Sequence, residues 1–117
     1  MENQTREKKV LGLIEKIKII GEEPRIVTAR IDTGARWSSI DLGLASQLKL
    51  GPIHKIKHIV SASSNGKTMR PLIKAKIKLK GRVMRSSFSL VDRSHMRYKV
   101  LIGVNVLKRG FIIDPQK

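Results

Sequence analysis

The 117-residue chain contains no cysteine, and this absence removes several kinds of chemistry at once. Disulfide bonds, thiolate catalysis and cysteine-based zinc or iron–sulfur sites all require thiols. Chemistry must therefore come from oxygen-containing or imidazole side chains. The chain also lacks an apolar run near the roughly 18 residues that span a membrane, and its N-terminus has no apolar segment of the secretory type. We therefore expect a soluble, cytoplasmic protein that does not bind a membrane.

Aromatic and acidic residues are both scarce. The four aromatic side chains are Trp37, Phe88, Tyr98 and Phe111, so stacking platforms for single-stranded nucleic acid are few. Asp and Glu number 9 against 25 Lys and Arg, which gives a formal net charge of +16. A field of this strength attracts polyanions. Nucleic acid and acidic peptide are both open as partners, and solvated basic strand faces are the alternative explanation of the charge.

Length and apolar content indicate one globular unit. A chain of 117 residues can bury one core, and 40% of its residues are hydrophobic. Residues 1–8 are polar, and we expect them to form a flexible tail ahead of a single domain over residues 9–117.

Alternating and β-branched segments predict a mostly β protein. The predicted strands cover residues 10–20, 25–31, 54–61, 72–79, 83–91, 100–102 and 111–113. Two short helices are expected, one over residues 40–50 with Asp41 as its N-cap and one over residues 105–109. The Asn65-Gly66 pair favours a tight hairpin turn. Lys74, Lys76 and Lys78 alternate with apolar residues and should share one face of their strand.

The sequence Asp32-Thr33-Gly34-Ala35 follows directly on a predicted buried strand and is the strongest candidate for chemistry. Gly34 allows close backbone approach, and Thr33 can hydrogen-bond across to a copy of the same loop. Two such carboxylates about 3 Å apart cannot both ionise cheaply, so they would share one proton. One would accept a proton from a bound water while the other donates to the scissile carbonyl. Asp, Thr and Gly are also ordinary turn residues, so this tetrapeptide alone is a weak signal.

A second element strengthens the assignment. Val100-Leu101-Ile102-Gly103 lies about 70 residues downstream and has the pattern of a strand, a glycine and then a helix. The combination resembles the retroviral proteases. Segments at residues 12–16, 29–36, 92–98 and 113–115 are similar to the cellular, single-domain retropepsin-like proteins that carry the label of ATP-dependent zinc proteases. The resemblance spans roughly Val10 to Pro115 and implies a closed β-barrel-like acid protease (retropepsin) fold with one or two short helices.

The resemblance also implies a function, that of an aspartic-type endopeptidase. Because the chain has one Asp-Thr-Gly, two chains are required, and the active species would be a symmetric homodimer. Asp32 would be catalytic, Thr33 and Gly34 would brace the two loops, and residues 61–69 would form the flap over the cleft. The candidate substrate-binding residues are Ala35, Arg36, Trp37, Ser63, Ser64, Lys67 and Arg70. Acidic peptides, including polyglutamate, are candidate substrates that suit the positive charge.

Two features depart from the family pattern. The ion pair that typically joins the catalytic loop to the second element is missing, because Arg36 and Val104 occupy its two positions. His54, His58 and His95 lack the H-E-x-x-H spacing, so we expect neither zinc nor another cofactor. The alternative to a peptidase is a non-catalytic retropepsin-like module that binds nucleic acid or an acidic protein through its basic surface.

Overall fold

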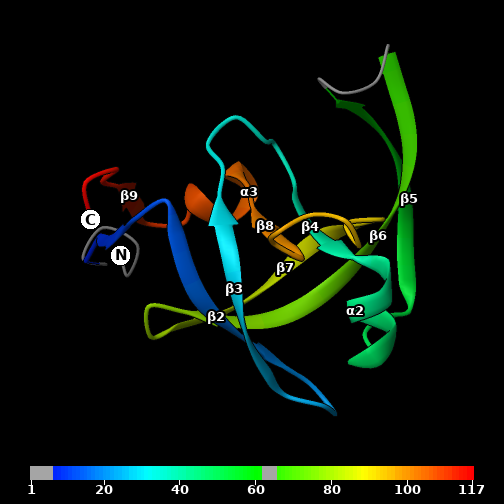
Figure 1. Cartoon of the computed structure of the whole chain (residues 1–117), viewed down its shortest axis with the longest axis horizontal. Coiled ribbons are helices and arrows are strands. Elements are labelled where there is room, and N and C mark those ends of the chain that lie inside the picture. The colour runs from blue at the N-terminus through cyan, green and yellow to red at the C-terminus, as the bar shows by residue number, and fades with distance from the viewer. Residues whose placement is uncertain (1–6, 62–65) are drawn as a thin grey trace, which may run out of the picture.

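The computed structural model describes residues 7–61 and 66–117 (Figure 1). These residues form nine strands and two short helices. They are β1 (Lys9–Leu11), β2 (Ile14–Ile20), β3 (Arg25–Ile31), β4 (Ser38–Asp41), α2 (Leu42–Gln47), β5 (Ile53–Ser61), β6 (Gly66–Leu79), β7 (Arg82–Val91), β8 (Val100–Ile102), α3 (Val104–Leu107) and β9 (Phe111–Ile113). Within the described ranges, neither helix is long and apolar enough to cross a membrane.

Six strands close into a barrel in the order β2-β3-β8-β4-β7-β6, and pairing of β6 back onto β2 completes the ring. Strand β5 lies outside the ring and pairs with β6 (Figure 1). Strands β1 and β9 form a separate parallel pair. The fold is therefore mostly β with a closed barrel and two short helices, as the sequence predicts.

The barrel interior is filled by alternate residues of its strands. On β6, Ile73, Ala75, Ile77 and Leu79 are buried, while Lys74, Lys76 and Lys78 between them are exposed. Side chains of a strand point to opposite faces in turn, so the lysines share the outer face, as expected. Burial of each large aliphatic side chain contributes about 1.5–3 kcal/mol, so these strands supply much of the core energy.

The segment predicted as one strand over residues 10–20 is two strands. The chain breaks at Gly12, whose N–H donates to Oε2 of Glu15 (2.7 Å). A Cβ added at Gly12 would lie 3.0 Å from the carbonyl oxygen of Lys117, so the C-terminal residues pass close to this bend. As a result β1 leaves the barrel and pairs with β9, a contact that local periodicity cannot reveal.

Helix α2 is shorter than the predicted span of residues 40–50, and its predicted N-cap is confirmed. Oδ2 of the buried Asp41 accepts a hydrogen bond from the N–H of Leu44 (3.1 Å), and Oδ1 accepts one from the N–H of Arg93 (2.8 Å). The same carboxylate thus fixes the start of the helix and the loop that follows β7. The sequence did not predict β4, because its serines suggest a loop although they are buried.

We expect Asp41→Ala to lower the free energy of unfolding by about 2–3 kcal/mol, because two buried N–H groups lose their acceptor. Urea denaturation at fixed protein concentration measures this. The matched control is Glu23→Ala in the exposed β2–β3 turn, which should change stability by less than about 0.5 kcal/mol. Equal unfolding midpoints for the two variants would contradict the role given to Asp41.

Candidate active site

Asp32 lies immediately after β3, at the start of the loop that leads to β4. Its N–H donates to the carbonyl oxygen of Ile102 (2.9 Å), which extends the pairing of β3 with β8 by one residue. Its Oδ1 accepts a hydrogen bond from the N–H of Gly34 (2.9 Å). The carboxylate is half-buried and its orientation is fixed by the turn. Because residues 32–37 contain the candidate catalytic residue Asp32, we refer to them as the catalytic loop.

Gly103 packs directly behind the catalytic loop. A Cβ added there would lie 2.7 Å from the carbonyl oxygens of Ala35 and Trp37, which is too close for any side chain. The first N–H groups of α3 complete the contact: Val104 donates to the carbonyl of Ala35 (2.8 Å) and Asn105 to that of Arg36 (3.1 Å). The strand, glycine and helix predicted from the sequence therefore support the loop from behind.

A buried polar network ties the end of the catalytic loop to α3. Oδ1 of Asn105 accepts hydrogen bonds from the N–H (2.9 Å) and Oγ (2.8 Å) of Ser38. Ser38 Oγ in turn accepts from the N–H of Gly103 (2.9 Å). Nδ2 of Asn105 donates to Oγ of Ser86 (3.1 Å) and to the carbonyl of Ser87 (2.9 Å). These neutral contacts hold the loop where the ion pair of the retroviral pattern is missing.

The sequence identified neither Ser38 nor Asn105 as part of the site. The two residues are 67 positions apart and carry no motif of their own. The available signal was the pair Ser38-Ser39 beside apolar residues, since a buried polar side chain requires a partner.

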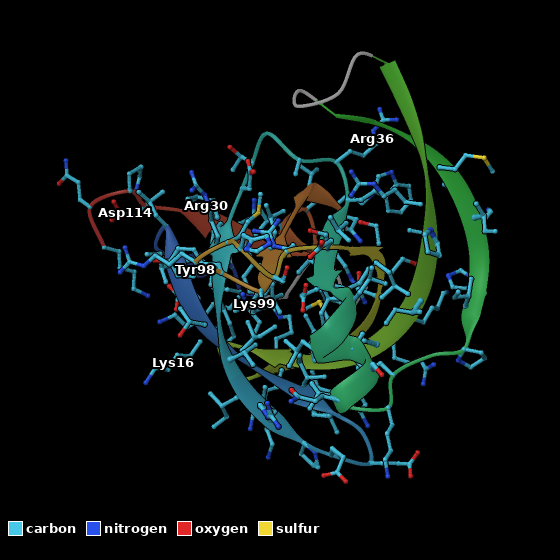
Figure 2. The ribbon with its side chains drawn as sticks, turned by 45° about the vertical axis from the view of Figure 1, so that its right-hand side comes forward. Lys16, Arg30, Arg36, Tyr98, Lys99 and Asp114 are labelled. Atoms are coloured by element: carbon cyan, nitrogen blue, oxygen red, sulfur yellow. The ribbon has the colours of Figure 1, made fainter. Side chains whose placement is uncertain are left out.

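Trp37 brings the catalytic loop into contact with the β5–β6 hairpin. Nζ of Lys57 on β5 lies 4.8 Å from the centroid of the Trp37 ring. Lys57 is opposite Arg70 on β6, so both cations belong to the part of the hairpin that faces the loop. Arg36 is exposed and lies on the side of the loop that faces this hairpin (Figure 2).

The other predicted substrate-binding residues are Ala35, Ser63, Ser64 and Lys67. Ala35 is half-buried, and its carbonyl is engaged by α3. Ser63 and Ser64 lie outside the described residues. The backbone of Lys67 belongs to β6 and pairs with Val60 of β5. Of the predicted residues, Trp37 contacts the hairpin through Lys57, and Arg70 is the cross-strand neighbour of that lysine.

The loop over residues 92–99 is a turn that its own side chains hold together. The N–H and Oγ of Ser94 donate to Oδ1 of Asp92 (3.0 and 2.6 Å), and these hydrogen bonds lower the pKa of the Asp92 carboxyl. Nζ of Lys99 donates to the carbonyl oxygens of Arg93, Ser94 and Met96 (3.1, 2.7 and 3.1 Å). The Lys99 ammonium thus organises the turn.

Arg93 is a buried cation, not identified from the sequence, whose charge interacts with the carboxylates of Asp41 and Asp32. Its side chain is 8% exposed, and its Nε donates to the carbonyl of Tyr98 (2.8 Å). Burial lowers the pKa of the Arg93 guanidinium, the charge of Arg30 lowers it further, and the carboxylates of Asp41 and Asp32 oppose both effects. A fixed positive charge is therefore within electrostatic reach of Asp32.

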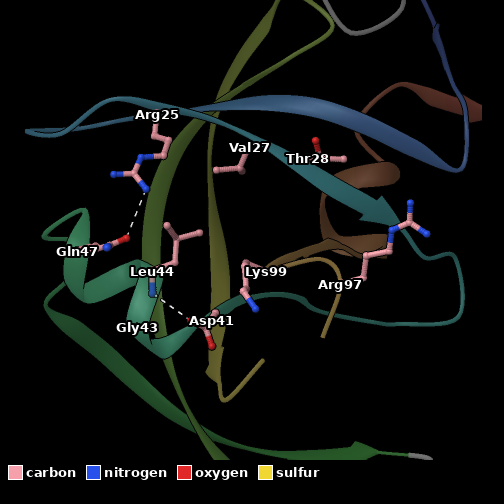
Figure 3. Close-up of a pocket in the computed structure, with 9 residues that line it drawn as sticks. All are labelled: Arg25, Val27, Thr28, Asp41, Gly43, Leu44, Gln47, Arg97 and Lys99. Carbon is pink, nitrogen blue, oxygen red and sulfur yellow. Dashed lines mark hydrogen bonds between the residues drawn. The ribbon is translucent and has the colours of Figure 1, made fainter. Parts of the chain in front are cut away.

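A pocket of about 580 Å³ lies between β3 and α2, apart from the catalytic loop (Figure 3). Its lining includes Arg25, Val27, Leu44, Gln47, Arg97 and Lys99. Nη1 of Arg25 donates to Oε1 of Gln47 (3.4 Å) across one side. No residue of the catalytic loop lines this pocket, so it is separate from the candidate active site.

Among the side chains that the structure describes, residues 7–57 and 69–117, no three His, Asp or Glu residues gather closely enough to hold a metal ion.

Comparison with known families decides the classification. Residues 45–117 match the family described as the retropepsin-like aspartic endopeptidase RimB. The chain belongs to the RimB-like family. Asp32 precedes the matched segment, whereas Gly103 and α3 fall within it. The resemblance stated from the sequence is thereby confirmed for the family, and no curated protein matches this RimB-like chain.

Solved structures show the same fold. One is the crystal structure of Lpg0085, a protein of unknown function (DUF785) from Legionella pneumophila, with a TM-score of 0.65 and 20% identity over 93% of this chain and 94% of that chain. Another is EIAV protease complexed with the inhibitor HBY-793, with a TM-score of 0.64 and 20% identity over 81% of this chain and 84% of that chain. The RimB-like chain therefore has the retropepsin fold.

We expect Gly103→Ala to destabilise the protein by about 1–3 kcal/mol or more, because the new methyl group overlaps two backbone carbonyls that cannot move independently. The comparison is Gly21→Ala, where a Cβ would contact only Cδ2 of Leu50 at 3.7 Å. Thermal unfolding of both variants measures the difference. If Gly103→Ala and Gly21→Ala unfold at the same temperature, the packing of Gly103 on the catalytic loop is not as close as described.

Proposed function

We propose that this RimB-like chain is an aspartic endopeptidase that acts as a symmetric homodimer. The observation that carries the proposal is the placement of Asp32. Its carboxylate follows a barrel strand, is oriented by the N–H of Gly34, and is supported from behind by Gly103 and α3. The family and the fold both point to the same chemistry.

The proposed mechanism uses one carboxylate from each chain. Hydrogen bonding to Gly34 engages Oδ1 of Asp32, which leaves Oδ2 for the water and for the second carboxyl group. The ionised member accepts a proton from the water as the water oxygen attacks the scissile carbonyl carbon, while the protonated member donates its proton to the carbonyl oxygen. When the tetrahedral intermediate collapses and the C–N bond breaks, the carboxyl group that took the water proton passes it to the leaving nitrogen, and the other carboxylate takes a proton back from a hydroxyl group of the intermediate.

The surface for the second chain is proposed to include the β1–β9 sheet. The catalytic loop lies between this sheet on one side and the β5–β6 hairpin on the other (Figures 1 and 2). Val10 and Ile112 are opposite each other in the sheet and are 39% and 48% exposed, and the neighbouring Leu13 is 50% exposed. Adjacent exposed apolar side chains are typical of protein interfaces.

Acidic peptides are the proposed substrate class. Lys57 lies over Trp37, Arg70 is its cross-strand neighbour, and Arg36 precedes Trp37 in the loop, so three cations belong to the segments between which a peptide would pass. The ionic contacts would select carboxylate side chains, and the Trp37 ring would provide apolar contact.

Asp32→Asn should lower the rate of peptide cleavage by at least about a thousandfold without loss of folding, because it removes the shared proton chemistry. The measurement uses poly-α-glutamate and a mixed peptide library. A sharper test mixes wild-type and Asp32→Asn chains at constant total protein. Activity should then fall with the square of the wild-type fraction, because a dimer of one wild-type and one variant chain has only one Asp32 carboxylate. A linear fall would show that each chain acts alone, and cleavage that persists in Asp32→Asn would end the assignment.

Ile112→Lys should weaken dimerisation, because two buried ammonium groups would replace an apolar contact at the two-fold interface. We expect specific activity to fall at least tenfold at low protein concentration and to recover as concentration rises. Ile26→Lys on β3, where the native side chain is 65% exposed, is the matched control. Sedimentation of both variants reports the assembly directly, and an unchanged dimer in Ile112→Lys would place the interface elsewhere.

A further inference from the structure

The outer faces of β2, β6 and β7 form a continuous basic surface, which we call the lysine face. Its members are Lys16, Lys18, Lys74, Lys76, Lys78 and Arg85. All six side chains are exposed. Lys16 projects outward from β2 in Figure 2.

Strand register places like charges directly opposite each other on the lysine face. Lys18 pairs with Lys78 across β2 and β6, and Lys76 pairs with Arg85 across β6 and β7. Neighbouring strands are about 4.8 Å apart, and alternate residues of one strand are about 7 Å apart. Both spacings lie within the Debye length of about 8 Å at physiological salt, so the potentials of the six charges add. Like charges in such cross-strand pairs destabilise a sheet.

Strands β6 and β7 supply no acidic residue to balance these charges. No Asp or Glu occurs between Asp41 and Asp92, a span that contains all of β6 and β7. In the described part of the chain, the ion pair joins Lys80 to Glu15 (3.7 Å), and neither residue belongs to the lysine face. Within these described residues the six cations of the lysine face therefore have no ion-pair partner.

We propose that the lysine face docks the phosphate backbone of a nucleic-acid duplex. Five of its six cations are lysines, which can contact phosphates as point charges without a fixed geometry. Strand β6 is paired with β2 on one side and with β7 on the other around Lys76 and Lys78, so a peptide strand cannot add to it here. This pairing disfavours an acidic peptide that would bind as an added strand, whereas phosphates need only the exposed cations.

The surface fits a duplex better than a single strand. Strands β2, β6 and β7 carry one aromatic residue, Phe88, and it is 1% exposed in the core. Binding of single strands depends on aromatic side chains on which unpaired bases stack. A duplex presents its phosphates outward and needs only cations, which this face supplies.

The test compares two variants of equal charge. Lys74→Gln/Lys76→Gln/Lys78→Gln removes the centre of the lysine face, and Lys49→Gln/Lys55→Gln/Lys108→Gln removes three exposed lysines elsewhere. Binding of a short labelled duplex, in DNA and RNA forms, is followed by fluorescence anisotropy over a range of salt concentrations. For the first variant, the slope of log K against log salt should fall by about 0.9 for each phosphate that is no longer neutralised. The second variant should keep the wild-type slope.

The outcomes separate the possible partners. Loss of duplex binding in the first variant alone supports the proposal, whether the duplex is DNA or RNA. Equal loss in both variants would show attraction by net charge only and would overturn the assignment to this face. Tighter, lysine-face-dependent binding of poly-glutamate than of duplex would also overturn it, in favour of an acidic protein. Peptide cleavage by the first variant should be unchanged, so this test is independent of the proposed catalytic role.

Discussion

The contact between Gly103 and the carbonyl groups of Ala35 and Trp37 is the constraint on which the site depends. It exists because β8 pairs with β3 and β4, so the start of α3 is pressed against the loop that joins those two strands. The N–H groups of α3 then satisfy the loop carbonyls, and Asn105 holds the loop's end through Ser38. Asp32 acquires a fixed orientation from backbone contacts, without an ion pair beneath it.

Much of the barrel could be predicted because burial imposes a period of two on each strand. On β6, that alternation correctly separated the core residues from Lys74, Lys76 and Lys78. The break at Gly12 was missed because its cause is the passage of Lys117, at the other end of the chain. The local motif together with the downstream glycine element made Asp32 a candidate, whereas Ser38 and Asn105 meet only through tertiary structure, across 67 positions.

The large positive charge has several separate uses in the structure. Lys99 holds a turn through three carbonyl oxygens. Arg82 likewise donates to the carbonyls of Glu7, Arg109 and Gly110, which ties the ends of the described chain to β7. Arg93 is buried, and its Nε donates to the carbonyl oxygen of Tyr98. Net charge does not distinguish these cations from the lysine face. In the described residues Lys99, Arg82 and Arg93 donate to carbonyl oxygens, whereas no side chain of the lysine face has a hydrogen-bond or ion-pair partner.

Strand β5 pairs with β6 but takes no part in the closed ring. Its separation from the loop would break the packing of Lys57 on Trp37 while every hydrogen bond around the barrel stays intact. The packing of β5 on the loop and the closure of the barrel therefore depend on different sets of interactions. Substitution of Lys57 or Trp37 would weaken the first contact and leave the strand pairing that closes the barrel intact, so the two can change independently.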